Sequence, residues 1–389
     1  MNVKKMIAPH IEAVPFSGIR KYFDLIYDMK GAISLGIGEP DFVTPYNIRE
    51  EGIYSLEKGY THYSANAGFI ELRQEICNYM QRRFNLSYEP EKDVLVTVGG
   101  SEAIDLAIRT IVSKGDEVII PEPSFVAYKG CTLFAGAVPV PINLKAENEF
   151  RLKREELEKV VTEKTKILIL GYPNNPTGAI MEYEDYVEIV DFLKDKDIMV
   201  ISDELYAELT YSGKNHVSIA NFEEMKDRTI VVNGLSKAYA MTGWRIGYAC
   251  GNEHIIEQMK KIHQYAIMCA PTTAQYAAIE ALKNSDDEVK EMVTEYNQRR
   301  RVVVDGFREI GFDCFEPRGA FYVFPDIRKT GLTSDQFCEE LLKEEKVLVI
   351  PGGAFGECGE GFVRATYANS MENLIEAISR IERFAKRFM

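Results

Sequence analysis

The chain has 389 residues, 46% of them hydrophobic and 27% charged, and its formal net charge is −14. This length exceeds what one hydrophobic core usually supports, so we expect two domains or one large domain with a smaller lobe. The acidic balance argues against a nonspecific nucleic-acid partner, because phosphates attract basic surfaces. No apolar run reaches transmembrane length, and the N-terminal segment has no signal-peptide pattern. We therefore predict a cytoplasmic protein with no membrane partner.

Cysteine and histidine usage agrees with this prediction. The seven cysteines are scattered without a C-x-x-C pair, and their odd number excludes a complete set of intramolecular disulfides. Thiols in a reducing cytoplasm are the expected state. The five histidines lack metal-ligand spacing, so no metal site is predicted.

Short apolar runs alternate with helical patterns from about residue 93 onward. The runs are continuous, which is typical of strands covered on both faces. Apolar residues at helical spacing separate them, for example over residues 100–112. Strand, helix and strand in repetition predict an α/β fold with a mostly parallel sheet and helices on both faces. The predicted strands are residues 93–98, 117–121, 166–172, 198–202 and 229–233.

The C-terminal part has a different pattern, which predicts a smaller α+β lobe. A predicted helix near residues 18–30 and the loop 35–45 are expected to pack with this lobe. We predict a large domain over residues 46–284 and a small domain from residues 1–45 and 285–389. The remaining predicted elements are helices over residues 285–310 and 333–344, strands over 320–324, 346–350 and 361–367, and a last helix ending near Lys386.

Unusual residues follow several predicted strands, where open parallel sheets bind ligands. Gly99, Gly100 and Ser101 lie where strand 93–98 turns into a helix. Free N–H groups and the helix dipole there suit a phosphate group. A tight turn with Ser101 as the helix N-cap is an equally good interpretation of this turn alone.

Two further strand ends carry polar groups. Asp203 directly follows an apolar strand, where a carboxylate needs a cation or strong donors. Tyr206 is close enough in sequence to face the same crevice. The loop "YPNNPTG" (172–178) ends the preceding strand. The alternatives are an N-cap role for Asp203 and an ordinary turn for the loop.

Lys237 stands among small and apolar residues in "NGLSKAYAMTGWRIGY" (233–248). A partly desolvated lysine has a depressed pKa and can attack aldehydes. Arg245 offers a planar fork for a phosphate group. A phosphate site, a strand-end carboxylate, an asparagine, a tyrosine and this lysine on one sheet edge together match pyridoxal 5'-phosphate (PLP).

An ordered set of motifs carries a resemblance that runs over nearly the whole chain. The set is "GEPDF", "THYSANAGFIELR", "YPNNPTG", "SDELY", "SKAYAMTGWRIGY" and "FVRATYA". With these motifs the chain resembles the class I/II aminotransferases among the fold-type I PLP-dependent enzymes, and particularly the aspartate, aromatic and N-acetyl-diaminopimelate aminotransferases. The resemblance implies a large domain around a mostly parallel seven-stranded sheet and a smaller α+β domain.

The resemblance also implies roles around the cofactor ring. Lys237 would bind PLP covalently and then move the proton between the substrate Cα and the cofactor. Asp203 would keep the pyridine nitrogen protonated. Asn175 and Tyr206 would hydrogen-bond the phenolic oxygen, and Phe125 would stack on the ring.

Other residues are implied to bind the anionic groups. Gly100, Ser101 and Arg245 would bind the cofactor phosphate. Tyr63 would reach the phosphate of the other subunit, which implies a homodimer with shared active sites. The set implied to bind the substrate α-carboxylate is Arg364, Asn175 and the Gly38 backbone.

The implied reaction is a ping-pong transfer of the amino group of an L-amino acid to a 2-oxo acid such as 2-oxoglutarate. Side-chain specificity is expected to depend on residues around Ser17 to Arg20, Ile37 and Ser101. Some aspartate-specific relatives have a lysine where Ser101 stands, which argues against strict aspartate preference. The loop resemblance also predicts a cis Asn175–Pro176 bond.

Three other functions are weighed against this one. A PLP-dependent C–S β-lyase would use the same lysine and aspartate on the same fold. A ligand-sensor domain of a transcription regulator is disfavoured by the acidic charge and by the early start of the family pattern. A nicotinamide dehydrogenase lacks G-x-G-x-x-G in the required context.

Overall fold

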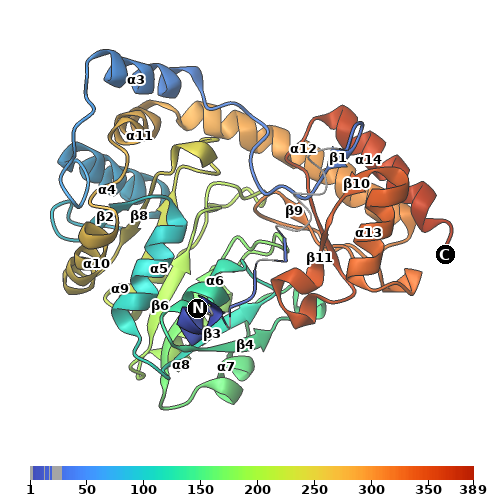
Figure 1. Cartoon of the computed structure of the whole chain (residues 1–389), viewed down its shortest axis with the longest axis horizontal. Helices are drawn as coiled ribbons and strands as arrows, with labels where there is room; N and C mark the ends of the chain where they lie inside the picture. The colour runs from blue at the N-terminus through green and yellow to red at the C-terminus, as the bar shows by residue number, and fades with distance from the viewer. Residues whose placement is uncertain (1–2, 13, 17, 20–28) are drawn as a thin grey trace.

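The computed structural model describes residues 3–12, 14–16, 18–19 and 29–389. A seven-stranded sheet forms its centre, in the order β2-β8-β7-β6-β5-β3-β4 (Figure 1). Only β8 runs antiparallel to its neighbours, so the sheet is mostly parallel as predicted. The strands are β2 (Val94–Thr97), β3 (Glu117–Glu122), β4 (Val138–Asn143), β5 (Thr165–Gly171), β6 (Met199–Asp203), β7 (Thr229–Gly234) and β8 (Gly247–Cys250).

The five apolar runs of the sequence form β2, β3, β5, β6 and β7. Neither β4 nor β8 was among the strands predicted from the sequence. The strand β4 is an edge strand that is largely exposed or half-buried. It contains Pro139 and Pro141, which cannot donate to a sheet and are confined to such edges. The strand β8 is only four residues long and includes Gly247, so neither strand has a continuous apolar run.

Helices cover both faces of the sheet, which explains why the strand sequences do not alternate. On β5, Ile167 and Ile169 pack in one core cluster with α5 and α10. Leu168 and Leu170 point to the other face and pack in a second cluster with α8. The helices of this part are α3 (Tyr46–Glu57), α4 (Ile70–Phe84), α5 (Gly100–Ile111), α6 (Ala127–Phe134), α7 (Arg154–Val160), α8 (Tyr183–Leu193), α9 (Glu223–Lys226), α10 (Glu253–Ala266) and α11 (Thr272–Asn284).

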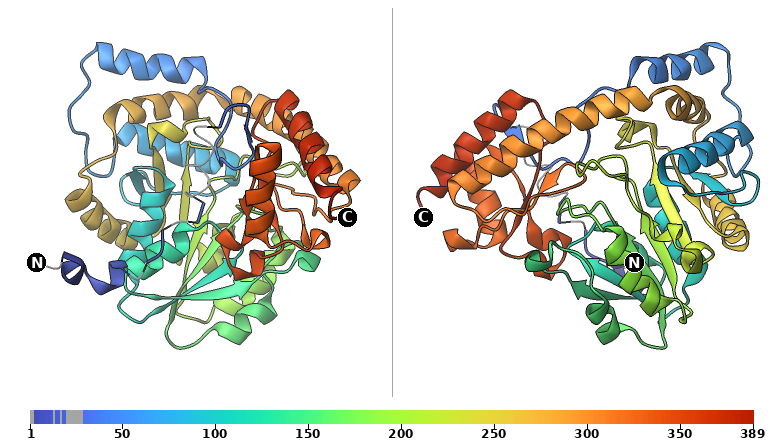
Figure 2. Two further views of the ribbon diagram at one scale, coloured as in Figure 1. Left: turned by 45° about the vertical axis from the view of Figure 1, so that its right-hand side comes forward. Right: turned by 180° about the vertical axis from the view of Figure 1, so that it is seen from behind.

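A second group of elements packs beside the carboxyl ends of the central strands (Figure 2). Strand β1 (Ile33–Ser34) pairs with β10 (Val347–Leu348), and β12 (Val363–Thr366) lies between β11 (Ile350–Pro351) and β9 (Tyr322–Val323). These strands are shorter than the predicted runs. Their helices are α12 (Asp286–Ile310), α13 (Ser334–Glu345) and α14 (Met371–Ala385), and the short α1 (Pro9–Glu12) lies at the N-terminal end.

The predicted domain limits can be compared with these elements. Helix α3 begins at Tyr46 and α11 ends at Asn284, and the seven-stranded sheet lies between them. The division itself stays a prediction. Most of the predicted helix near residues 18–30 lies outside the described residues. In the part of the chain that the structure describes, no helix has the length and apolarity needed to cross a membrane.

Helix α14 provides a direct test of the core of this second group. Leu374 is fully buried, whereas its neighbour Ile375 is 56% exposed. We expect Leu374→Ala to lower the free energy of unfolding by about 2–5 kcal/mol, because a cavity replaces packed methyl groups. The matched control Ile375→Ala should change it by less than about 0.5 kcal/mol. Denaturant unfolding of both variants makes the comparison, and equal losses would contradict this packing.

Candidate active site

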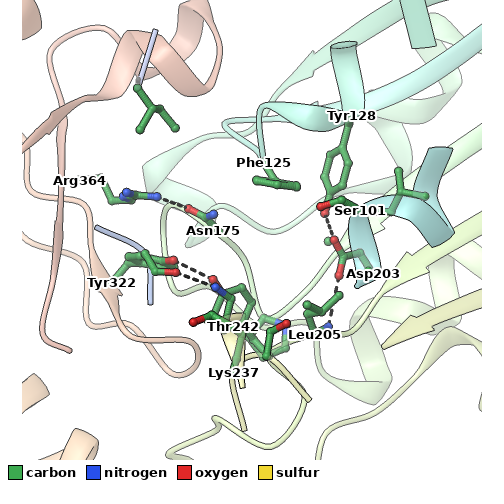
Figure 3. Close-up of a pocket in the computed structure, with 18 of the residues that line it drawn as sticks. Ser101, Phe125, Tyr128, Asn175, Asp203, Leu205, Lys237, Thr242, Tyr322 and Arg364 are labelled. Atoms are coloured by element: carbon green, nitrogen blue, oxygen red, sulfur yellow. Dashed lines mark hydrogen bonds between the residues drawn. The ribbon is translucent and has the colours of Figure 1, made fainter. Parts of the chain in front are cut away.

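A cavity of about 260 Å³ lies at the carboxyl ends of β5, β6 and β7, between the central sheet and the second group of elements (Figure 3). Ten of the eleven residues expected at the site line it: Gly38, Gly100, Ser101, Phe125, Asn175, Asp203, Tyr206, Lys237, Arg245 and Arg364. Tyr63 does not line it and is 81% exposed. The cavity thus lies at the strand ends, where open parallel sheets bind ligands, and the roles of its residues stay predictions.

The turn between β2 and α5 forms one end of the cavity. Gly99 is the N-cap of α5 and has a left-handed φ of 76°, while Ser101 lies inside the helix. The alternative of Ser101 as N-cap is therefore wrong. The α5 N–H groups that have no intrahelical partner begin here. The guanidinium of Arg245 lies beside Gly99, since a Cβ added to Gly99 would lie 2.5 Å from Arg245 Nη2. This end of the cavity can accept a phosphate group.

Asp203 ends β6 and is held by two donors. The Tyr128 hydroxyl donates to Oδ2 at 2.7 Å, and the Leu205 N–H donates to Oδ1 at 3.2 Å (Figure 3). Burial raises the pKa of the Asp203 carboxyl, and these two hydrogen bonds oppose the shift. A turn rather than a helix follows Asp203, so the N-cap alternative is wrong.

Lys237 follows β7 and points toward the loop of the second group. Its Nζ donates to the Gly38 carbonyl oxygen at 2.6 Å and lies 5.8 Å from the centre of the Tyr206 ring. Burial lowers the pKa of the Lys237 amine to about 8. Glu39 opposes this shift, and Arg364 adds to it. The amine is thus more easily deprotonated than an ordinary lysine.

Arg364 on β12 is 2% exposed and has no acidic partner among the described residues. One Nη donates to Asn175 Oδ1 at 2.9 Å, and the other donates to the Gly36 carbonyl oxygen at 2.5 Å. The Nε atom is buried without a hydrogen-bond partner in the described structure. A buried guanidinium in this state favours an anionic ligand, because an unpaired buried charge is costly.

Two tyrosines at the site were not predicted. Tyr128 fixes Asp203, and the Tyr322 hydroxyl lies 2.7 Å from that of Tyr206. The Tyr322 ring also lies under Arg364, 4.5 Å from the guanidinium carbon. In the sequence each of them is only a tyrosine within a mostly apolar segment, where a buried hydroxyl needs a hydrogen-bond partner.

The predicted cis bond and the predicted specificity residues can each be compared with the structure. The Asn175–Pro176 bond is not cis; within the described residues the cis bonds are Tyr172–Pro173, in the same loop, and Glu122–Pro123. The prediction of a cis Asn175–Pro176 bond is therefore wrong. Of the residues expected to set specificity, Ser101 lines the cavity, and so does Ile19, which lies between Ser17 and Arg20, whereas Ile37 does not. Ser17 and Arg20 themselves lie outside the described residues.

Comparison with known proteins identifies the family. The model of the aminotransferase class I and II family matches residues 30–381. The chain therefore belongs to this family, whose members are enzymes that transfer amino groups between amino acids and 2-oxo acids. Its α/β architecture is that of the fold-type I aminotransferases.

Individual relatives cover nearly the full length. The chain is 50% identical over 378 residues to the Bacillus subtilis (strain 168) protein YugH, which is 97% of this chain and 98% of YugH. It is 45% identical to an aspartate aminotransferase of Pyrococcus abyssi, with 97% of each chain covered. The solved structure of an aromatic aminotransferase from Pyrococcus horikoshii OT3 is similar with a TM-score of 0.90 and 44% identity, over 95% of this chain and 99% of that one.

The depressed pKa of Lys237 predicts a pH-dependent stability difference. Below about pH 8 the folded protein must bury the Lys237 charge, and this penalty disappears as the pH rises from about 8 toward 10.5. In protein freed of small molecules, Lys237→Met should therefore remove a destabilisation of at most about 3 kcal/mol at pH 7. Melting curves at pH 7 and pH 9.5 check this. A stability difference between variant and wild type that does not shrink at the higher pH would contradict the burial of this amine.

Proposed function

We propose that this chain is a PLP-dependent aminotransferase that moves the amino group of an L-amino acid, such as aspartate or an aromatic one, to a 2-oxo acid such as 2-oxoglutarate by a ping-pong mechanism. The observation that carries the proposal is the convergence of Lys237 and Asp203 on one cavity beside the amino end of α5. This arrangement provides an amine, a carboxylate and a phosphate-binding turn within a single cavity. When bound, PLP supplies an electron sink that stabilises negative charge at the substrate Cα.

The cavity residues fit the parts of PLP by their chemistry. Lys237 Nζ would hold the cofactor covalently, which the lowered pKa of this amine favours. The Asp203 carboxylate would keep a proton on the pyridine nitrogen, in an orientation fixed by Tyr128. Asn175 and Tyr206 would donate to the phenolic oxygen. Each of these groups lines the cavity, and their donors and acceptors match those of the ring substituents.

The remaining cofactor contacts are to the ring face and the phosphate. Phe125 would stack on the ring, and its own position is supported by an edge-to-face contact with Tyr128. The Gly100 N–H, Ser101 and Arg245 would bind the phosphate. Two features of Arg245 support phosphate binding. It has no acidic partner among the described residues, and it lies beside the glycine turn.

Lys237 is also proposed to move protons during the reaction. Once the substrate amino group has taken the place of Lys237 on the cofactor, the Lys237 amine would be free, and it would take a proton from the substrate Cα and return it to the cofactor. With a pKa of about 8 it can act as a base near neutral pH. Its hydrogen bond to the Gly38 carbonyl holds the amine at the boundary between the central sheet and the loop of residues 35–45.

Arg364 is proposed to bind the α-carboxylate of both substrates, with Asn175 and the Gly38 backbone beside it. The guanidinium is buried, planar and without an acidic partner in the described chain, so a carboxylate would complete its hydrogen bonding. The same group suits the amino donor and the 2-oxo acid, because both carry this carboxylate. A panel of amino donors with 2-oxoglutarate, ranked by kcat/KM, identifies the donor. Release of pyruvate and ammonia from cystathionine without an acceptor would instead indicate a C–S β-lyase.

A homodimer in the cytoplasm completes the proposal. Apolar and aromatic side chains on and after α3 are exposed in the single chain, including Ile53 (52%), Leu56 (55%) and Tyr63 (81%). A second copy would bury such a surface, and Tyr63 of the partner subunit would then reach the phosphate. All seven cysteines, each within the described part of the chain, are free thiols, which is consistent with a reducing compartment.

Replacement of Lys237 tests the catalytic assignment. Lys237→Ala should lower turnover by about 10³-fold or more, because it removes both the point of attachment and the proton carrier. The visible absorption that arises from the PLP–lysine bond should also vanish. Lys194→Ala, at a lysine 43% exposed on the surface, is the control and should preserve both properties. A Lys237 variant that keeps turnover and absorption would refute the proposal.

Replacement of Arg364 tests carboxylate binding. Arg364→Lys keeps a positive charge but loses the planar fork, so kcat/KM should fall about 10- to 100-fold for donor and acceptor alike. Single-turnover measurements of the two half-reactions give these values separately. Arg328→Lys, at an arginine 67% exposed on the surface, provides the matched control. Unchanged values in both half-reactions would mean that another group binds the carboxylate.

A further inference from the structure

The turn that begins α5 is held by a side chain from inside the helix. Glu102 lies in the first turn of α5, one residue after Ser101, and its Oε2 accepts the Val98 N–H at 2.5 Å. This bond closes the segment from Val98 to Glu102 into a compact loop around the left-handed Gly99. The carboxylate thus satisfies a main-chain donor and fixes the path of the glycine turn.

The other oxygen of Glu102 contacts a buried histidine. Oε1 lies 2.7 Å from Nδ1 of His263, which is fully buried in the last turn of α10. His263 Nε2 is also buried and has no hydrogen-bond partner in the described structure. Nδ1 is therefore the ring nitrogen that donates to Glu102, because a carboxylate only accepts hydrogen bonds.

The opposite side of the turn is closed by direct backbone packing. A Cβ added to Gly247 of β8 would lie 2.7 Å from the Gly100 nitrogen, and a Cβ added to Gly100 would lie 2.3 Å from Leu205 Cδ1. The turn therefore packs closely against the β8 backbone and the Leu205 side chain. The hydrogen bond from the Val98 N–H to Glu102 restrains the turn from within, and the contact with His263 is the second hydrogen bond that holds the Glu102 carboxylate.

We propose that His263 is a positioning residue for cofactor binding, which acts through Glu102 on the phosphate-binding turn without touching the cofactor. The inference rests on the proposed function, because it assumes that the turn binds the phosphate of PLP. A Glu102 carboxylate released from His263 could turn toward the neighbouring Ser101 and repel the phosphate dianion, and the Val98–Gly100 backbone would lose its fixed geometry. Both effects weaken the binding of the phosphate and spare the ring.

Equilibrium binding to the cofactor-free protein separates these effects. The two probes are PLP and pyridoxal, which has the same ring and aldehyde but no phosphate. His263→Leu fills a similar volume but cannot donate, and should weaken PLP binding at least about tenfold, as expected for a hydrogen bond to a charged group. Its affinity for pyridoxal should change less than about twofold, since the Lys237 and Asp203 contacts are untouched.

His263→Asn is the matched variant, because its Nδ2 occupies nearly the position of the histidine Nδ1. Asparagine leaves more empty space than leucine, so a purely structural role for His263 predicts the larger loss for His263→Asn. If His263 instead acts through Glu102, His263→Asn should lose less PLP affinity than His263→Leu. The PLP affinity of His263→Asn should then stay within about threefold of wild type. Melting curves of the cofactor-free variants record any packing loss separately. His263→Phe replaces His263→Leu if the leucine variant does not fold.

The binding measurements give different results if the positioning role fails and if the proposed function fails. Equal losses of PLP affinity in the leucine and asparagine variants, or parallel losses for PLP and pyridoxal, would overturn the positioning role. Unchanged PLP affinity in His263→Leu would overturn it as well. Wild-type protein that binds neither probe would refute the proposed function and the inference together.

Discussion

The excess of positive charge around one cavity is the constraint on which the rest of the site depends. In the described part of the chain the cavity wall carries Lys237, Arg245 and Arg364 but only one carboxylate, Asp203. Arg364 is buried and Lys237 is largely buried, whereas Arg245 is exposed. Two largely buried cations with a third at the mouth of the same cavity raise the free energy of the folded chain unless anions join them. Burial lowers the pKa of Lys237, and Arg364 and Arg245 add smaller contributions, so this amine can lose its charge. Binding of a phosphate and a carboxylate would also relieve the excess of positive charge.

The fold makes this concentration of charge possible by bringing distant segments together. Parallel strands deliver Asp203 and Lys237 to the same sheet edge, and the second group of elements delivers Arg364 from β12. The Arg364 guanidinium bonds to Asn175 on one side and to the Gly36 carbonyl on the other, so it joins both parts of the molecule. Each cation has main-chain or amide acceptors that orient it, and these acceptors leave its charge available to a ligand.

Much of the central sheet could be predicted from the sequence, because strands buried on both faces have continuous apolar runs. The edge strand β4 could not, since prolines and half-exposed positions erase that signal. The ten cavity-lining residues were predictable because they follow strand ends or belong to specific motifs. Tyr128 and Tyr322 were missed because their partners are 75 and 116 residues away, and no local pattern encodes such pairs. The choice of cis proline failed for a similar reason, as two prolines in one loop look alike in sequence.

Among the described residues Arg364 has no acidic partner, and this has a consequence for selectivity. A guanidinium that is satisfied by any carboxylate cannot tell one amino acid or oxo acid from another. In the proposed ping-pong reaction the same site admits two chemically different acids in turn, and such a lack of discrimination would then be an advantage. Discrimination is then left to whatever surrounds the variable end of each substrate. The part of the site that binds the common carboxylate can stay constant while relatives use different amino acids. This fits a family that includes both aspartate and aromatic-amino-acid aminotransferases.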